Sequence, residues 1–126
     1  MNYCHLIESS GTGTLQVTIN LANEQSKNRN HSVTVIYSKR KSTPKNFKEN
    51  FNKNVNLILV DMSNVFKIII AMFILLKLLN KIKPNVLFLH SSIAGAVGRL
   101  ACFFSKKKNF SFIYTSRNFF FEYFRF

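Results

Sequence analysis

Continuous apolar runs alternate along this chain with segments in which apolar residues recur every third or fourth position. The runs are typical of buried strands, and the wider spacing is typical of helices. The predicted strands cover residues 3–7, 32–37, 55–60, 86–89 and 110–115, and the predicted helices cover residues 15–22, 65–81 and 93–101. The order β-α-β-β-α-β-α-β predicts an α/β fold, a parallel sheet with helices on both faces. We expect the third strand, 55–60, to be fully buried, and the polar run 23–30 to end the first helix.

The second predicted helix is the most apolar part of the chain. Its nine residues from Ile68 to Leu76 are uninterrupted, and Lys67 and Lys77 stand at either end. Nine helical residues rise about 14 Å, whereas the hydrocarbon core of a bilayer is roughly 30 Å thick. We therefore expect a buried or surface-lying helix and not one that spans a membrane.

The fourth strand and third helix enclose a polar hinge, His90-Ser91-Ser92. Open α/β sheets bind ligands where such a strand ends before a helix N-terminus. His90 suits proton transfer there, and the alternative is a histidine satisfied by the backbone at the sheet edge. Arg99, on the following helix, suits a bidentate contact to phosphate or, equally, a solvated position.

A second candidate site is the loop Gly11-Thr12-Gly13 after the first strand. Its backbone N–H groups suit contact with a phosphate or sugar, and the alternative is an ordinary tight turn. The loop lacks the third glycine of a dinucleotide-binding fingerprint, and the chain has no Walker A motif. The second strand runs into Ser38-Lys39-Arg40 and not into an acid, so the sequence does not support an NAD-type ribose contact.

Length, composition and net charge limit the kinds of protein that this chain can be. The 126 residues suffice for one domain, and 47% of them are hydrophobic, as in a folded chain. The net charge of +13 favours anionic partners, although a Lys- and Asn-rich composition alone would also produce it. The basic connection 38–54 has few aromatic residues among its lysines, so nucleic acid is not expected as a partner.

The cysteines point to a reducing compartment. Cys4 and Cys102 stand alone in apolar segments, without a CxxC or His partner, so we expect buried thiols and no metal site. Residues 1–14 lack the basic and apolar regions of a signal peptide. The expected location is the cytoplasm.

Four places together resemble the N-terminal domain of GT-B glycosyltransferases of the subfamily 4-like, group 1 type, many of which build capsular and lipopolysaccharide chains. The resemblance covers residues 3–120. Its four places are the first strand with its glycine loop (5–13), the entry to the second strand (30–35), the stretch 83–99 with His90-Ser-Ser-x-Ala-Gly-x-x-Gly-Arg99, and the turn Ile113-Tyr-Thr-Ser-Arg117-Asn118. The stretch 83–99 is the most specific of them.

The resemblance implies a Rossmann-like, acceptor-side domain that faces a second domain holding most of the nucleotide-sugar donor. It implies a saccharide or lipid-linked acceptor and no resident cofactor or metal. The candidate substrate-binding residues are Gly11, Thr12, Gly13, His90, Ser91, Arg99 and Arg117. Arg117 and Asn118 replace a His-Gly pair found in many relatives, and no catalytic residue is assigned.

The resemblance also sets expectations for the domain boundaries. We expect the glycosyltransferase domain at residues 1–118 and an aromatic tail at 119–126, either covered by a continuation or left as a truncation scar. A second, donor-binding domain does not fit in this length, so the chain is expected to be a hexosyltransferase-type enzyme only when completed by it. Lysines 39–53 and the apolar helix favour peripheral docking on the inner face of the plasma membrane. The alternative function is a non-catalytic basic α/β module that binds anionic lipid or nucleic acid.

Overall fold

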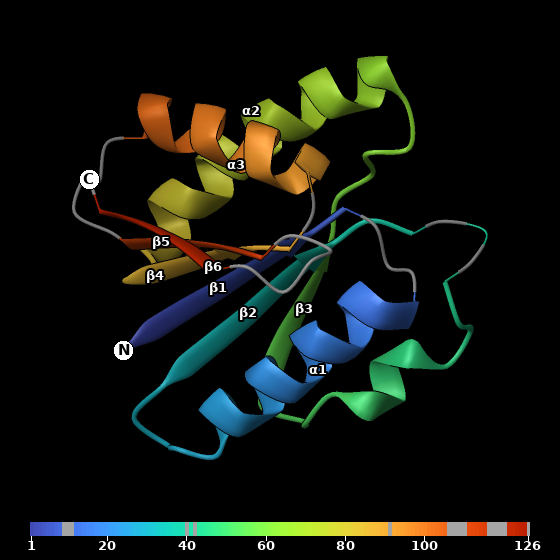
Figure 1. Cartoon of the computed structure of the whole chain (residues 1–126), viewed down its shortest axis with the longest axis vertical. Coiled ribbons are helices and arrows are strands. Elements are labelled where there is room, and N and C mark those ends of the chain that lie inside the picture. The colour runs from blue at the N-terminus through green and yellow to red at the C-terminus, as the bar shows by residue number, and fades with distance from the viewer. Residues whose placement is uncertain are drawn as a thin grey trace.

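The structure, a computed structural model, describes residues 1–8, 12–39, 41, 43–90, 92–105, 111–115 and 121–125. One sheet carries α1 on one face and α2 and α3 on the other (Figure 1), so the predicted α/β fold is confirmed. The elements are β1 (Asn2–Ile7), α1 (Thr12–Ser26), β2 (Ser32–Tyr37), the 3₁₀ helix η1 (Phe47–Asn50), β3 (Val55–Leu59), α2 (Val65–Ile82), β4 (Val86–Leu89), α3 (Ser92–Phe104), β5 (Ser111–Thr115) and β6 (Phe121–Arg125).

The strand order is β3-β2-β1-β4-β5-β6. The first five strands in this order are parallel, and β6 runs antiparallel to β5. β1 is central: it pairs with β2 from Asn2↔Ser32 onward and with β4 from Tyr3↔Val86 onward. The order turns back between β1 and β4, which is the pattern of a Rossmann-like sheet.

Alternate residues of the central strands point to opposite faces, and each face has its own apolar core. Leu6 and Leu89 belong to the core beneath α2 and α3. Ile7, Val35 and Tyr37 belong to the core beneath α1 and η1. Both faces of the parallel sheet are therefore buried, as continuous apolar strands require.

The ends of α2 follow from its flanking residues. The Asn64 side chain caps the first turn, since its Oδ1 accepts a bond from the Lys67 N–H at 2.8 Å. At the other end Lys83 adopts the left-handed conformation, with φ of 51°, and its N–H donates to Leu79 O ahead of Pro84. Within the part of the chain that the structure describes, no helix is long and apolar enough to cross a membrane, as the sequence predicted for this one.

Of two predictions of local structure, one is wrong and one is confirmed. β3 is not fully buried: it lies at the sheet edge with only β2 beside it, and Asn56 and Leu59 are exposed. The first helix ends at Ser26, inside the polar run 23–30 as predicted, and polar side chains of its last turn bond the segment that follows η1.

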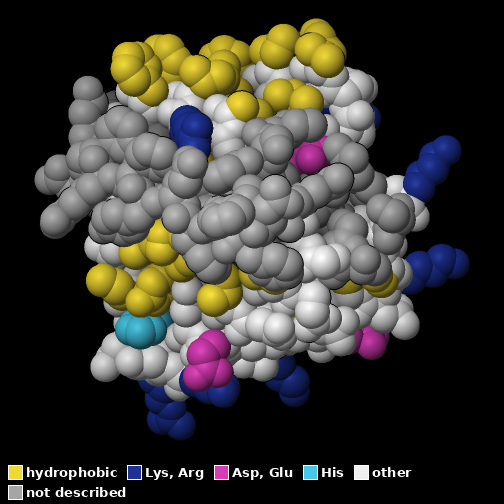
Figure 2. Space-filling view, in the orientation of Figure 1, with side chains coloured by type: hydrophobic (Ala, Val, Ile, Leu, Met, Phe, Trp, Pro, Cys, Tyr) yellow, Lys and Arg dark blue, Asp and Glu magenta, His cyan; other side chains and the backbone are white. Residues whose placement is uncertain are grey.

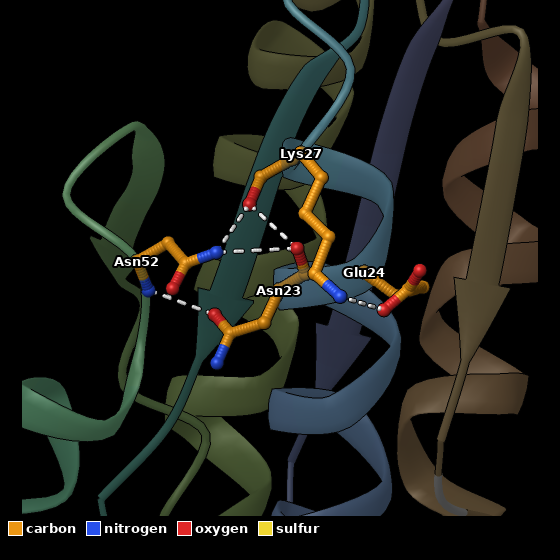
Figure 3. Close-up of polar contacts among 5 residues, drawn as sticks. Asn23, Glu24, Lys27 and Asn52 are labelled. Carbon is orange, nitrogen blue, oxygen red and sulfur yellow. Dashed lines mark hydrogen bonds and ion pairs between the residues drawn. The ribbon is translucent and has the colours of Figure 1, made fainter.

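That segment is the end of the basic connection between β2 and β3. The Asn52 N–H donates to Asn23 Oδ1 at 2.7 Å, and the Asn52 amide reaches Asn23 O and Ser26 Oγ at 3.2 and 3.0 Å (Figure 3). Phe47 and Phe51, the aromatics of the connection, are buried in the core under α1. The connection is therefore fixed to the α1 face at its far end.

The aromatic tail takes part in the sheet. Phe121–Arg125 pair with Thr115–Ser111 as an antiparallel edge strand. The sequence prediction placed these residues outside the domain, and the boundary at residue 118 stays a prediction.

Candidate functional site

The carboxyl ends of β1 and β4 lie side by side where the strand order turns back. His90 follows β4 and extends this pairing, because its N–H donates to Leu6 O at 3.0 Å. α3 begins two residues later, at Ser92. Open α/β sheets bind ligands at this reversal, and His90 lies there, between β4 and α3, as its sequence position predicted.

The His90 side chain is held by another histidine. Its Nε2 lies 2.9 Å from Nδ1 of His5 in β1, and His5 Nε2 lies 2.7 Å from Oε1 of Gln25 in α1. The two imidazole planes differ by only 8° with centroids 5.2 Å apart, so the rings meet edge to edge. The ring of Phe88 lies parallel to His5, with centroids 4.5 Å apart. Both histidines are buried. Their rings are held in place jointly by residues of β1, of α1 and of the end of β4.

Burial keeps this histidine pair neutral. Desolvation lowers the pKa of His5 from 6.5 to about 4, against an opposing effect of the bond to Gln25. Desolvation, followed by repulsion from His5, also holds the pKa of His90 well below 6.5. Near pH 7 the pair therefore shares a single hydrogen between the two facing nitrogens.

The neutral state sets the tautomer of His90. With the Gln25 oxygen facing it, His5 must donate from Nε2, because a carbonyl oxygen only accepts. His5 Nδ1 is then the acceptor, and His90 donates to it from Nε2. His90 is left with an unprotonated Nδ1, which is the form that accepts a proton or a hydrogen bond. Gln25 and His5 thus set both the position of the His90 ring and which of its nitrogens carries the hydrogen.

The glycine loop differs from its prediction in one respect. Gly13 lies in the first turn of α1, which begins at Thr12, and not in the loop before it. Gly13 is exposed, and a Cβ added there would meet nothing within 4 Å. Because the first N–H groups of a helix have no partner within it, this open end suits an anionic or hydroxylated ligand.

The remaining predicted residues divide into two groups. Gly11, Ser91 and Arg117 lie outside the described residues, as does the side chain of Thr12. Arg99 is exposed on α3, which covers the opposite face of the sheet from the His5–His90 pair. The structure therefore does not bring Arg99 together with the His90 side chain.

Three residues near the site were not predicted as functional. They are His5 in β1, Gln25 in α1 and Glu8 at the end of β1. Glu8 follows β1 directly and is buried. Their sequence signal is positional: His5 points to the same face as His90, and Glu8 is an acid at the carboxyl end of a buried strand.

The described residues offer neither a metal site nor a reactive cysteine. Among the residues that the structure describes, no group of three His, Cys, Asp or Glu could hold a metal ion. Burial raises the pKa of the Cys4 thiol to about 12, so this cysteine is a core residue and not a nucleophile. Cys4 is buried as predicted, whereas the Cys102 side chain lies outside the description.

Comparison with known proteins gives one clear result. The sequence model of the family described as glycosyl transferase 4-like matches residues 10–120, which include Gly13, Gln25 and His90. The search of curated proteins finds no match. The family match covers most of the chain and confirms the resemblance predicted from the sequence.

Proposed function

Because the chain belongs to the glycosyl transferase 4-like family, we propose that it is the acceptor-side, N-terminal half of a GT-B glycosyltransferase. It acts in transfer of a sugar from a nucleotide-sugar to a saccharide or lipid-linked acceptor, on the cytoplasmic side of the membrane, in cell-surface polysaccharide synthesis. The observation that carries the proposal is the placement of His90, oriented by His5 and Gln25, at the strand-order reversal.

The geometry supports a division of roles within this half. The exposed first turn of α1 at Gly13 offers N–H groups to a phosphate or to sugar hydroxyls. His90, whose tautomer His5 and Gln25 set, lies at the carboxyl end of β4 beside β1, and we assign this position to the acceptor. A second domain of the same architecture, as the family resemblance implies, would hold most of the donor.

A binding experiment tests this division. In ¹⁵N-labelled chain, titration with nucleotide-sugars and with acceptor saccharides should shift the backbone amides of Gly13, Leu89 and His90. Gly13→Val places a branched side chain in the open space at the start of α1 and should weaken that binding about tenfold or more. Asn20→Val, two turns later on the same exposed side of α1, is the matched control and should bind as before.

The alternative, a basic module without chemistry, predicts a different outcome. Any polyanion would then bind, with an affinity that falls steeply with salt, and Gly13→Val and Asn20→Val would behave alike. Amide shifts confined to the lysines of residues 39–53, with no response to sugars, would refute the glycosyltransferase proposal.

A further inference from the structure

The outer surface of α2 and α3 is unusually apolar. Hydrophobic side chains gather along the upper edge of the molecule over these two helices (Figure 2). Nine large hydrophobic residues of the two helices are exposed: Val65, Phe66, Ile69, Ile70, Phe73, Ile74, Leu100, Phe103 and Phe104. Surfaces of this kind on soluble chains mark binding faces, and we call these nine residues the apolar face.

On α2 the apolar face continues into a pair of lysines. Phe66, Ile70 and Phe73 recur at spacings of three and four, so they lie on one side of the helix. Lys77 and Lys81 follow at the same spacing and are also exposed. This side of α2 is thus apolar in its first half and cationic in its second.

The neighbouring helix α3 adds a second apolar row. Leu100, Phe103 and Phe104 lie at spacings of three and four near its end, and the rings of Phe103 and Phe104 are 5.2 Å apart. Arg99 is exposed beside them. α2 and α3 pack against each other over the same core, so the two rows belong to one surface.

The charge of these helices indicates what covers the face. Together α2 and α3 contain Lys67, Lys77, Lys81 and Arg99 but no acid. The nearest acid in sequence, Asp61, already pairs with Lys67 at 2.8 Å. A second copy would bring the same cations against these, whereas an anionic lipid surface matches both the apolar rows and the lysines at their end.

The basic connection cannot share this surface. Phe47 and Phe51 anchor it in the core under α1, and α2 and α3 cover the other side of the sheet. A flat membrane touches only one side of a sheet. The predicted joint docking by the connection and the apolar helix therefore reduces to docking by α2 and α3.

We propose that the apolar face of α2 and α3 lies flat on an anionic lipid bilayer, with its aromatic and aliphatic side chains below the headgroups and Lys77 and Lys81 at the lipid phosphates. The sheet then runs along the membrane surface, with the carboxyl ends of β1 and β4 at one end of it. The inference that docking brings His90 near a lipid-linked acceptor rests on the proposed function, but the docking itself does not.

Flotation with lipid vesicles tests the proposal. The chain should bind vesicles of phosphatidylcholine mixed with phosphatidylglycerol and bind pure phosphatidylcholine much more weakly. The double variant Phe66→Ser, Phe73→Ser should lower the partition coefficient at least about tenfold. Lys77→Gln and Lys81→Gln should each lower it about fivefold, on the anionic vesicles only.

Matched controls lie away from these helices. Leu59→Ser makes the same kind of change at an exposed apolar residue of β3, and Lys45→Gln, Lys53→Gln removes two exposed cations of the connection. Both controls should bind vesicles within about twofold of the unmodified chain. Circular dichroism spectra of all variants should match, because only exposed side chains are changed.

Three results would overturn the docking proposal. The first is equal loss of binding in Lys45→Gln, Lys53→Gln, and the second is no preference for anionic vesicles. The third is a dimer in sedimentation velocity that Phe73→Ser separates, without vesicle binding by the unmodified chain, since the face would then pair two copies. None of these readouts involves sugar binding, so failure here leaves the test of the proposed function standing.

Discussion

The two faces of the sheet are built in different ways. Over the α1 face, polar side chains of Asn23, Gln25 and Asn52 fix helix, strand and connection by directed hydrogen bonds, and no large hydrophobic residue of α1 or η1 is exposed. Over the other face, α2 and α3 are held mainly by apolar packing, with a bond from Ser105 Oγ to Asn80 Oδ1 at 3.0 Å, and they expose an apolar surface. Directed bonds serve the face that orients a site, and non-directional packing serves the face that has a broad surface to cover.

The largest expected contrast between the faces is in pH dependence. The unfolded chain binds a proton at His5 near pH 6.5, but the folded chain does so only near a pKa of about 4. The free energy of unfolding should therefore fall as the pH drops from about 6.5 to about 4, by roughly 3 kcal/mol from His5. Burial acts on His90 in the same direction.

Thermal unfolding across this range measures the effect. His5→Gln removes the titrating group and should flatten the dependence, and His31→Gln, a histidine outside the pair, should leave most of it. An unfolding temperature that is the same at pH 7 and pH 4.5 would contradict a buried neutral pair.

Close packing of the α3 face predicts a smaller effect. A Cβ added at Gly98 would lie 2.4 Å from Leu89 Cδ2 and 3.3 Å from Leu6 Cδ2, and both leucines are buried, so the Leu89 side chain would have to shift within the core. Gly98→Ala should cost about 1–2 kcal/mol of stability despite the better helix propensity of alanine. Gly13→Ala, on the open end of α1, should instead stabilise by about 0.5–1 kcal/mol. Urea unfolding that ranks the two variants the other way would contradict this packing.

The next largest effect is expected from the hydrogen bonds between α1 and the connection that follows η1. Asn23→Ala removes an acceptor of the Asn52 N–H and a donor to Asn50 O, both at 2.7 Å. The expected cost is about 1 kcal/mol, with faster amide hydrogen exchange at Asn52. Asn20→Ala, on the same helix and bonded only to Gln16 among the described contacts, should leave the exchange at Asn52 unchanged.

The smallest effect is expected on the apolar face. Phe73 is 61% exposed, so Phe73→Ser should change the free energy of unfolding by less than about 0.5 kcal/mol. Leu75→Ala, two residues later but buried at 1% exposure, should cost about 3 kcal/mol. Urea unfolding of this pair separates residues that hold α2 in place from residues that cover its outside. A large loss in Phe73→Ser would show that this ring is already covered in solution.

Sequence patterns alone predicted the features that depend on a single strand or helix. The bounds of β2 and β4 are those predicted, and α2 matches the predicted helix 65–81 to within one residue. The patterns were insufficient where the partner is distant. Nothing local shows that β3 lies at an edge.

The candidate site shows the same limit. His90 was predicted from its position after an apolar strand, which is a local signal. Its bond to His5, 85 residues earlier, depends on β1 and β4 being neighbours, and only the strand order provides that. Gln25 was missed because the polar run 23–30 indicated only the end of a helix. In the structure Asn23 and Ser26 bond the connection after η1, and Gln25 bonds the buried His5.

The central place of β1 has a consequence for biosynthesis. β1 leaves the ribosome well before its partner β4, which is made about 80 residues later. At translation rates of 5–20 residues per second this is a wait of roughly 4 to 16 s. Through that time the β4 side of β1 is an unpaired edge with Cys4 and Leu6 lacking their core. The nascent chain is therefore most vulnerable to aggregation, and most in need of chaperones, before residue 86 emerges.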